Sequence, residues 1–321
     1  MHKTLTGGAI AITLAAASLF IAAPASAASA VELPSGDELW GISCDGEEML
    51  GLTISTTDAV GTVVGTGSST IDSDCGGPGA VDPTTGTAYF ISWGQETELA
   101  IFDPATGDST AVGTFFDGDV DVDADSMAIG IDGAAYLIDD NRLYSLKLSD
   151  ATVTFIANIP DVERGFFGFA ADPTTGIIYA VSVDGAVYTV SAAGVFTPAG
   201  TITLPDSETD IWALQIDSNG TWWIENDGVN ADIWSLTPAG FAGGATLSGV
   251  VTVGGEELYL ESLLILPTAD VVPTEVVNPA PAPVLANTGG DTTQGLIAGG
   301  AALLLLAAGA ALALIGKRRT A

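Results

Sequence analysis

Five aspartates at every second position form the densest group of potential ligands in the chain: Asp117, Asp119, Asp121, Asp123 and Asp125. Such a series of carboxylates repels itself unless water solvates it fully or a cation neutralises it. Ca²⁺ takes roughly six to eight hard oxygen ligands, and carboxylates are a usual source of them. The stretch therefore indicates either a solvated acidic loop or a Ca²⁺ site formed by these five aspartates.

The same stretch partly matches the loop of a Ca²⁺-binding hand. Counting from Asp121, the aspartates fall at about positions 1, 3 and 5 of such a loop, and Asp132 falls at about position 12. Ser126 stands where that loop needs glycine, and residues 127–131 are apolar in the manner of a strand. The match to a hand is thus incomplete, and Ca²⁺ is the only cofactor that the sequence indicates.

Histidine, the usual base in nucleophilic catalysis, is missing from the chain after residue 2. The only histidine is His2, inside the N-terminal segment, which excludes Ser-His-Asp and Cys-His catalysis and His-ligated zinc in an exported chain. A carboxylate pair could still cleave a glycosidic bond, but 40 acidic residues make the presence of a pair uninformative. We expect no catalytic residue and no enzyme, with carboxylate-dependent glycan cleavage as the alternative.

Tryptophans could stack on sugar rings, yet tryptophans inside strands more often fill a core. We expect packing roles for most of the set: Trp40, Trp93, Trp212, Trp222, Trp223 and Trp234.

Two cysteines, Cys44 and Cys75, are the only ones in the chain. An even pair in an oxidising extracellular setting predicts a disulfide. It would close a loop of about 30 residues and stabilise the fold by roughly 3–4 kcal/mol. The alternative, a pair of reactive thiols, lacks a basic neighbour that would favour the thiolate.

A repeat defines the elements that must position these residues. Residues 81–89 (VDPTTGTAY) recur as residues 171–179 (ADPTTGIIY), and less closely at residues 131–136 and 216–222. In the turn, proline fixes one φ, glycine supplies a positive φ, and aspartate accepts local backbone hydrogen bonds. Each unit of about 40–50 residues contains four short apolar stretches, which is typical of a β-propeller blade.

Blades can be counted from their second strands, which are expected at residues 39–42, 88–91, 135–138, 178–181 and 222–224. The first unit lacks an inner strand, and residues 258–265 are left over at the other end. A leftover strand that completes the first blade would remove exposed sheet edges. The sequence therefore predicts an all-β, five-bladed propeller over residues 31–267, closed by a C-terminal strand; a six-bladed ring and a β-sandwich are the alternatives. It resembles the propeller-like repeats of bacterial surface proteins in general.

Acidic residues gather in the loops that share one face of such a ring. The loops between blades contain Asp72, Asp74, the aspartates at 117–125, Asp161, Glu163, Asp206, Glu208 and Asp210. The loops between second and third strands contain Asp45, Glu47, Glu48, Glu96, Glu98, Asp139, Asp140, Asp184, Glu225, Asp227 and Asp232. We expect one strongly negative face.

The N-terminal end has the features of a signal peptide. Lys3 precedes an apolar segment at residues 7–23, and Ala25 and Ala27 supply the small-residue cleavage pattern. We expect a signal peptide over residues 1–27, cut by signal peptidase after Ala27, with a cut after Ala30 as the alternative.

At the C-terminal end, a Pro-rich spacer (268–284) precedes the pentapeptide Leu285, Ala286, Asn287, Thr288 and Gly289. An apolar segment (295–316) long enough for a transmembrane helix and a basic tail (317–321) follow. This order resembles the cell-wall sorting signal of Gram-positive surface proteins, in the variant with alanine in place of proline. The resemblance implies that a sortase cuts after Thr288 and links the protein to peptidoglycan. A tail-anchored membrane protein is the alternative.

The exported residues 28–288 contain 39 acidic residues against Arg142, Lys147 and Arg164, a formal charge of −36. Nucleic acid is excluded as a partner because its recognition needs basic residues. We expect an extracellular, wall-anchored, non-catalytic binding or adhesion module with a protein or glycan ligand. The alternatives are the carboxylate-dependent enzyme acting on carbohydrates and a surface-structural protein without a specific ligand.

Overall fold

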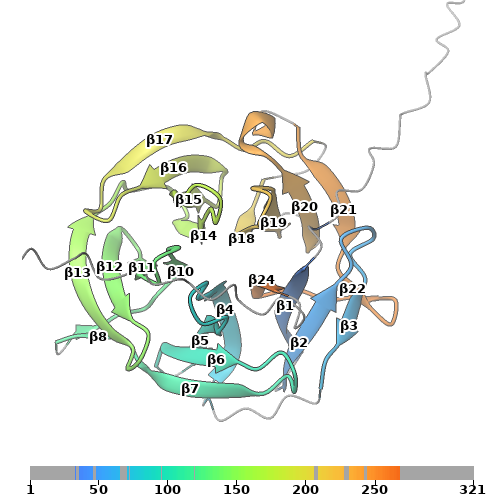
Figure 1. Cartoon of the computed structure of the whole chain (residues 1–321), viewed down its shortest axis with the longest axis horizontal. Helices are drawn as coiled ribbons and strands as arrows, with labels where there is room; N and C mark the ends of the chain where they lie inside the picture. The colour runs from blue at the N-terminus through green and yellow to red at the C-terminus, as the bar shows by residue number, and fades with distance from the viewer. Residues whose placement is uncertain are drawn as a thin grey trace, which may run out of the picture. The chain divides into compact units, whose positions relative to one another are not determined.

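The computed structural model describes residues 33, 36–45, 48–65, 71, 73–94, 96–118, 120–205, 209–227, 231–241 and 244–267, all within the unit Met1–Val272. These residues form five four-stranded sheets that are arranged as blades around a ring (Figure 1). Neighbouring strands in every blade are antiparallel. The fold is the five-bladed β-propeller that the repeat predicts.

Within each blade, the strands follow one another from the centre of the ring outward (Figure 1). Blade 1 contains β24 (Ser262–Pro267), β1 (Asp37–Asp45), β2 (Glu48–Ile54) and β3 (Gly61–Val63). Blade 2 contains β4 (Ser73–Val81), β5 (Ala88–Gly94), β6 (Glu98–Phe102) and β7 (Ser109–Thr114). Blade 3 contains β10 (Ser126–Ile129), β11 (Ala135–Asp139), β12 (Arg142–Lys147) and β13 (Thr152–Asn158).

Blade 4 contains β14 (Phe166–Ala171), β15 (Ile178–Ser182), β16 (Ala186–Val190) and β17 (Phe196–Thr201). Blade 5 contains β18 (Ile211–Ile216), β19 (Trp222–Asn226), β20 (Asp232–Leu236) and β21 (Thr246–Val250). Outside the blades lie the hairpins β8 (Phe116–Asp117) with β9 (Val120–Asp121) and β22 (Thr252–Val253) with β23 (Glu256–Glu257), and the short helix η1 (Pro238–Gly240). All five second strands contain the residues expected for them.

Blade 1 is assembled from both ends of the described chain. The C-terminal strand β24 pairs with β1 in a register that runs from Asp37 opposite Pro267 to Ile42 opposite Ser262. The N-terminal part of the chain supplies the other three strands of this blade. The predicted C-terminal closing strand is therefore confirmed.

The turn between first and second strands is held by its aspartate. In blade 4, Asp172 Oδ1 accepts the N–H of Thr174 (2.7 Å), and Asp172 Oδ2 accepts the hydroxyl of Thr175 (2.8 Å). Gly176 closes the turn at φ +71°, which favours glycine. Burial opposes ionisation of Asp172, but these hydrogen bonds outweigh it and lower its pKa. The turn at residues 82–86 repeats the arrangement.

Five hydrophobic clusters fill the seams between neighbouring blades. Between blades 1 and 2, the Trp40 and Phe102 rings lie 5.7 Å apart, edge to face. Between blades 4 and 5, the Tyr179 and Trp222 rings lie 4.7 Å apart. Because alternate residues of a strand point to opposite faces, each inner strand contributes to two seams. The ring therefore has no single core.

The propeller has two unlike faces, which we name by their connections. The turn face carries the turns between first and second strands, such as residues 82–86 and 172–176. The loop face carries the loops between blades and between second and third strands, such as residues 159–165. Pro267 and its partner Asp37 lie at the turn face, where the Ser218 N–H donates to Asp37 Oδ2 (3.0 Å). The described chain thus begins and ends on the turn face.

Several expected segments lie outside the described residues: the signal peptide (1–27) with Ala25 and Ala27, the spacer (268–284), the pentapeptide (285–289), the apolar segment (295–316) and the tail (317–321). No helix in the described part of the chain is long and apolar enough to cross a bilayer.

Replacing Leu264 by alanine should strongly destabilise the ring. Leu264 is fully buried in the closing strand β24, and a buried Leu→Ala change lowers the free energy of unfolding by roughly 2–5 kcal/mol. Leu247→Ala is the matched control, since Leu247 in β21 is 48% exposed and should change stability by less than about 0.5 kcal/mol. Urea unfolding of the full chain in detergent, followed by tryptophan fluorescence, measures both. Equal effects would contradict a stabilising role for β24.

Candidate functional site

Three aromatic rings from different blades form a row on the loop face. Trp93 near the end of β5 lies 6.5 Å from Phe167 in β14, and Phe167 lies 4.6 Å from Trp212 in β18. All three side chains are half-buried, so each keeps an accessible edge or face. We call these residues the aromatic row.

Hydrogen bonds fix both tryptophans of the row. Trp93 Nε1 donates to the Ala124 carbonyl oxygen (3.0 Å), and Trp212 Nε1 donates to Asp210 Oδ1 (3.0 Å). A ring held this way loses little further freedom when a ligand stacks on it. The row is therefore a preorganised apolar surface in an acidic setting.

One guanidinium joins the two sets of acidic loops. Arg164, between blades 3 and 4, donates to both carboxylate oxygens of Asp210 (2.9 and 3.0 Å). Its Nη1 also lies 3.7 Å from Asp184 Oδ1, in the loop between second and third strands of blade 4. These contacts confirm that both loop sets share one face.

A cavity of about 440 Å³ opens beside the row between blades 3 and 4. Its lining includes Asp125, Asp140, Asp161, Arg164 and Phe167, so it combines carboxylates, one guanidinium and one aromatic ring. The cavity is large enough for part of a sugar or a small peptide side chain.

Asp125 is the most perturbed carboxyl in this cavity. One carboxylate oxygen each of Asp125, Asp139 and Asp140 lies within 4.8 Å of the others. Burial is the main cause that raises the Asp125 pKa to about 6; the Asp140 N–H bond (2.7 Å) opposes it, and the charges of Asp139, Asp140 and Asp123 add to it. The negative charge of Asp139 is compensated by Arg142, whose Nη2 donates a hydrogen bond to its carboxylate (2.7 Å).

The five aspartates predicted to bind Ca²⁺ do not form one continuous loop. Asp117 and Asp121 belong to the β8–β9 hairpin, in which Phe116 pairs with Asp121. Asp123 Oδ1 accepts the Thr97 hydroxyl (2.7 Å), whereas Asp125 lies in the cavity. Asp119 lies outside the described residues. Ca²⁺ binding by this stretch stays a prediction.

The alignment with a Ca²⁺-binding hand is wrong at its last position. Strand β10 separates Asp125 from Asp132 and carries Asp132 to the turn face. A strand rises about 3.3 Å per residue, so the two carboxylates cannot coordinate one ion. The apolar residues of this segment form the inner strand of blade 3 instead.

The two cysteines lie in neighbouring blades, Cys44 in β1 opposite Met49 and Cys75 in β4 opposite Trp93. Their side chains are outside the described ones, so the disulfide stays a prediction. The packing role expected for most tryptophans is confirmed for four buried ones: Trp40, Trp222, Trp223 and Trp234.

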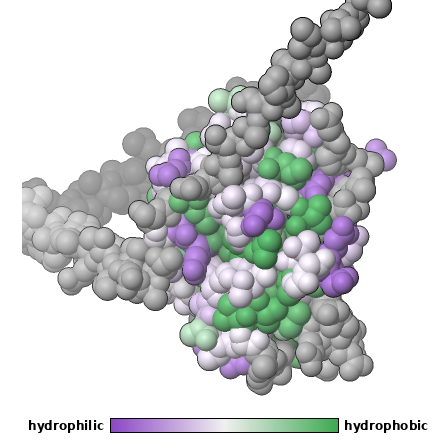
Figure 2. Space-filling model, turned by 90° about the vertical axis from the view of Figure 1, so that its right-hand side faces the viewer, coloured by the Kyte–Doolittle hydropathy of each residue, from purple (hydrophilic) through white to green (hydrophobic). Residues whose placement is uncertain are grey.

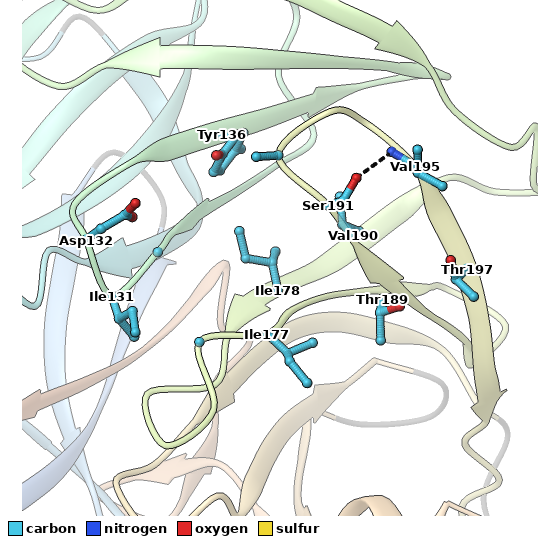
Figure 3. Close-up of a pocket in the computed structure, with 13 residues that line it drawn as sticks. Ile131, Asp132, Tyr136, Ile177, Ile178, Thr189, Val190, Ser191, Val195 and Thr197 are labelled. Carbon is cyan, nitrogen blue, oxygen red and sulfur yellow. Dashed lines mark hydrogen bonds between the residues drawn. The ribbon is translucent and has the colours of Figure 1, made fainter.

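A second cavity, of about 650 Å³, lies on the turn face between blades 3 and 4 (Figure 3). Figure 3 shows Ile131, Asp132 and Tyr136 of blade 3 on one side of it, and Ile177, Ile178 and Val195 of blade 4 toward the other side. At the rim of the cavity, within the turn between β16 and β17, the Val195 N–H donates to the Ser191 hydroxyl (3.1 Å). This cavity is mainly aliphatic and lacks the converging charges of the loop face.

The outer side of the ring over β3 and β22 shows apolar patches separated by polar residues (Figure 2). Val60 and Val63 are 43% and 38% exposed. Exposed apolar residues of this kind are common on soluble domains. The loop face remains the better candidate site.

No family model matches the chain, and no curated protein matches it. Among solved structures, it is similar to a chain of a nidogen/laminin complex (12% identity, TM-score 0.49), over 72% of this chain and 98% of that one. A protein of unknown function from Bacteroides thetaiotaomicron matches at 16% identity and TM-score 0.45, over 72% of this chain and 64% of that one. Virginiamycin B lyase from Staphylococcus aureus matches at 14% identity and TM-score 0.40, over 71% of this chain and 79% of that one. None of these similarities assigns a chemistry to the loop face, so that chemistry is inferred from this chain's own residues.

Sequence reasoning located the acidic loops but missed the aromatic row and the role of Arg164. Each row residue lies at the end of a strand in a different blade, where no repeat marks it. The half-exposed Trp93 and Trp212 share their residue type with the core tryptophans. Only the closed ring brings the three together.

The Asp125 carboxyl should titrate near pH 6. Since its folded-state pKa lies above the unfolded value of 3.8, its contribution to stability is complete below about pH 3.8 and is lost as the pH rises through 6. The loss should be about 1–3 kcal/mol, and Asp125→Asn should remove it. Carboxyl ¹³C NMR titration measures the pKa, with Asp150, whose pKa the Lys147 hydrogen bond lowers, as internal reference. An Asp125 midpoint below that of Asp150 would contradict the buried, acid-surrounded environment.

Proposed function

We propose that this protein is an exported, cell-wall-anchored surface protein whose propeller binds an extracellular ligand on its loop face without catalysing a reaction. The observation that carries the proposal is the aromatic row, which is fixed by hydrogen bonds among carboxylates on the face opposite to the chain ends. A tether attached beyond Pro267 starts from the turn face. The loop face then stays accessible to a ligand.

The chemistry of the loop face favours a cationic ligand. The exported chain has a formal charge of −36, and its electrostatic field attracts cations and repels anions. Indole faces bind cations at about 0.5–2 kcal/mol per contact, and the row offers two of them. Amino sugars and basic side chains combine positive charge with an apolar surface for stacking. We infer a cationic glycan or peptide segment, and no nucleic acid.

Anchoring rests on the order of the C-terminal segments. The pentapeptide 285–289, the apolar segment 295–316 and the basic tail 317–321 follow one another in the order of a sorting signal. The spacer 268–284 would hold the propeller clear of the wall, since proline-rich segments are extended. The implied partners are signal peptidase, a sortase and peptidoglycan.

A carboxylate-dependent enzyme acting on carbohydrates is the second candidate, because Asp125 combines a raised pKa with a place in a cavity. A carboxyl that holds its proton near pH 6 could protonate a glycosidic oxygen, provided that a second carboxylate lies across the bond. Asp161 lines the same cavity. Turnover of a glycan that is lost in Asp125→Asn would decide for this candidate.

Trp212→Ala should weaken binding of a cationic ligand at least tenfold, because it removes one ring of the row. Glucosamine oligomers and their N-acetylated, neutral counterparts are matched probes, with an oligolysine peptide as the third. Calorimetry with the full chain in detergent measures affinity, and binding of the charged probes should fall as salt rises. Tyr259→Ala is the control, since Tyr259 is a 54% exposed aromatic outside the row. Equal affinity for charged and neutral oligomers would contradict the cationic ligand, and no binding of any probe would favour a surface-structural role.

Thr288→Ala should stop transfer to the cell wall, because the sortase reaction implied by the motif needs the Thr288–Gly289 bond. The variant protein should stay in the membrane fraction instead of the fraction released by peptidoglycan hydrolase. Asn287→Ala is the control, at the position that the motif leaves open. Wall linkage of the Thr288 variant would contradict sorting and favour an ordinary membrane anchor.

A further inference from the structure

Glu225 occupies a position that is aliphatic in the other blades. On the second strand of every blade, an aromatic residue is followed two positions later by a residue on the same face of the sheet. In blade 5 the aromatic residue is Trp223 and the residue after it is Glu225. The corresponding residues of blades 1 to 4 are Ile42, Ile91, Ile138 and Val181.

The Glu225 side chain points into the seam between blades 5 and 1. Its cross-strand neighbours are Ala213 in β18 and Ile233 in β20, and both belong to the hydrophobic cluster of this seam. Directly opposed residues of antiparallel strands share a face, so Glu225 shares theirs. Its side chain is only 1% exposed, and neither carboxylate oxygen has a hydrogen-bond partner.

Further oxygen ligands approach the same seam from both blades. Ser43 in β1 is fully buried, its hydroxyl has no hydrogen-bond partner, and its opposite neighbour Leu50 packs against the cluster of this seam. Glu261, just before β24, donates its N–H to the Ile42 carbonyl oxygen (2.8 Å). Asp227 and Glu261 both act electrostatically on Glu225. Oxygen atoms of two blades thus lie around this seam, but no three carboxylate oxygens of its described residues lie within 4.8 Å of one another.

No cationic side chain of the propeller is available to this seam. Arg142 pairs with Asp139, Lys147 with Asp150, and Arg164 with Asp184 and Asp210. Between residues 165 and 316 the sequence contains neither lysine nor arginine. A buried carboxylate needs a partner or must give up its charge. A cation that pairs with the charged form of Glu225 would therefore come from outside the propeller.

We propose that the seam between blades 5 and 1 binds Ca²⁺, with the buried, unpartnered Glu225 as its central ligand and with the Ser43 hydroxyl and the Asp227 and Glu261 carboxylates drawn in around the ion. An oxygen-only set with several carboxylates suits Ca²⁺, whereas it has no nitrogen or sulfur ligand for zinc or copper. Because one side of the seam is blade 1, which β24 completes, the ion would hold the closed ring together.

Burial makes a free charge on Glu225 costly. Burial, followed by the charges of Asp227, Glu261, Asp210 and Asp232, raises its pKa well above the usual value. The seam therefore disfavours an uncompensated negative charge at this position.

The test compares wild type with Glu225→Ile and Glu225→Gln, using the full chain in detergent. Glu225→Ile restores the residue type of the other blades, so it should fold and melt higher than wild type in chelator. At a hundred times the Kd of the seam ion, Ca²⁺ should raise the melting temperature of wild type by about 5–10 °C more than that of either variant. Calorimetric titration with CaCl₂ should show one fewer bound ion per chain in both variants.

Glu163→Gln is the matched control, because it removes an exposed carboxylate from the loop between blades 3 and 4 and should keep the seam ion. The proposal is overturned if both Glu225 variants keep the full Ca²⁺ shift and stoichiometry. It is also overturned if wild type binds no Ca²⁺, since Glu225 would then be a buried acid without a bound cation. None of these results depends on the ligand proposed for the aromatic row.

Discussion

The pairing of β24 with β1 is the constraint on which the rest of the propeller depends. A ring of blades has seams instead of a central core, so every blade needs two neighbours to bury both of its faces. β24 serves two seams at once: Leu263 packs against blade 5, and Leu264 packs against blade 2. Without this strand, two of the five clusters would lose an inner wall, and β1 would present an unpaired edge.

Most of the acidic residues named above are accommodated in one of two ways. At the turn face, Asp82 and Asp172 are occupied by local hydrogen bonds that shape the turns. At the loop face, carboxylates stay near solvent or meet one of the few basic residues, as Asp210 meets Arg164. Glu225 fits neither pattern, because it is buried in a seam without a partner. That exception is the physical basis for expecting a bound cation.

Features that repeat along the chain were predictable from the sequence, and features that depend on ring closure were not. The turn of residues 82–86 and its copy at 172–176 fix strand order locally, so the blades and the closing strand could be placed. The aromatic row joins residues from three blades, and no local pattern connects them. Glu225 was predictable only in part. The sequence shows it at an aliphatic position of the repeat, but its burial follows only from the packing of blade 5 on blade 1.

The closing strand also determines how the propeller would respond to force. A pull on the chain beyond Pro267 acts along the axis of β24, since the chain leaves the ring at the end of that strand. The load is then parallel to the strand and perpendicular to its hydrogen bonds to β1. Sliding β24 along β1 would require all of these hydrogen bonds to break together instead of one after another. A ligand held on the loop face would load the blades from their opposite end. With the proposed tether and ligand, this arrangement would resist mechanical shear along the line that joins them.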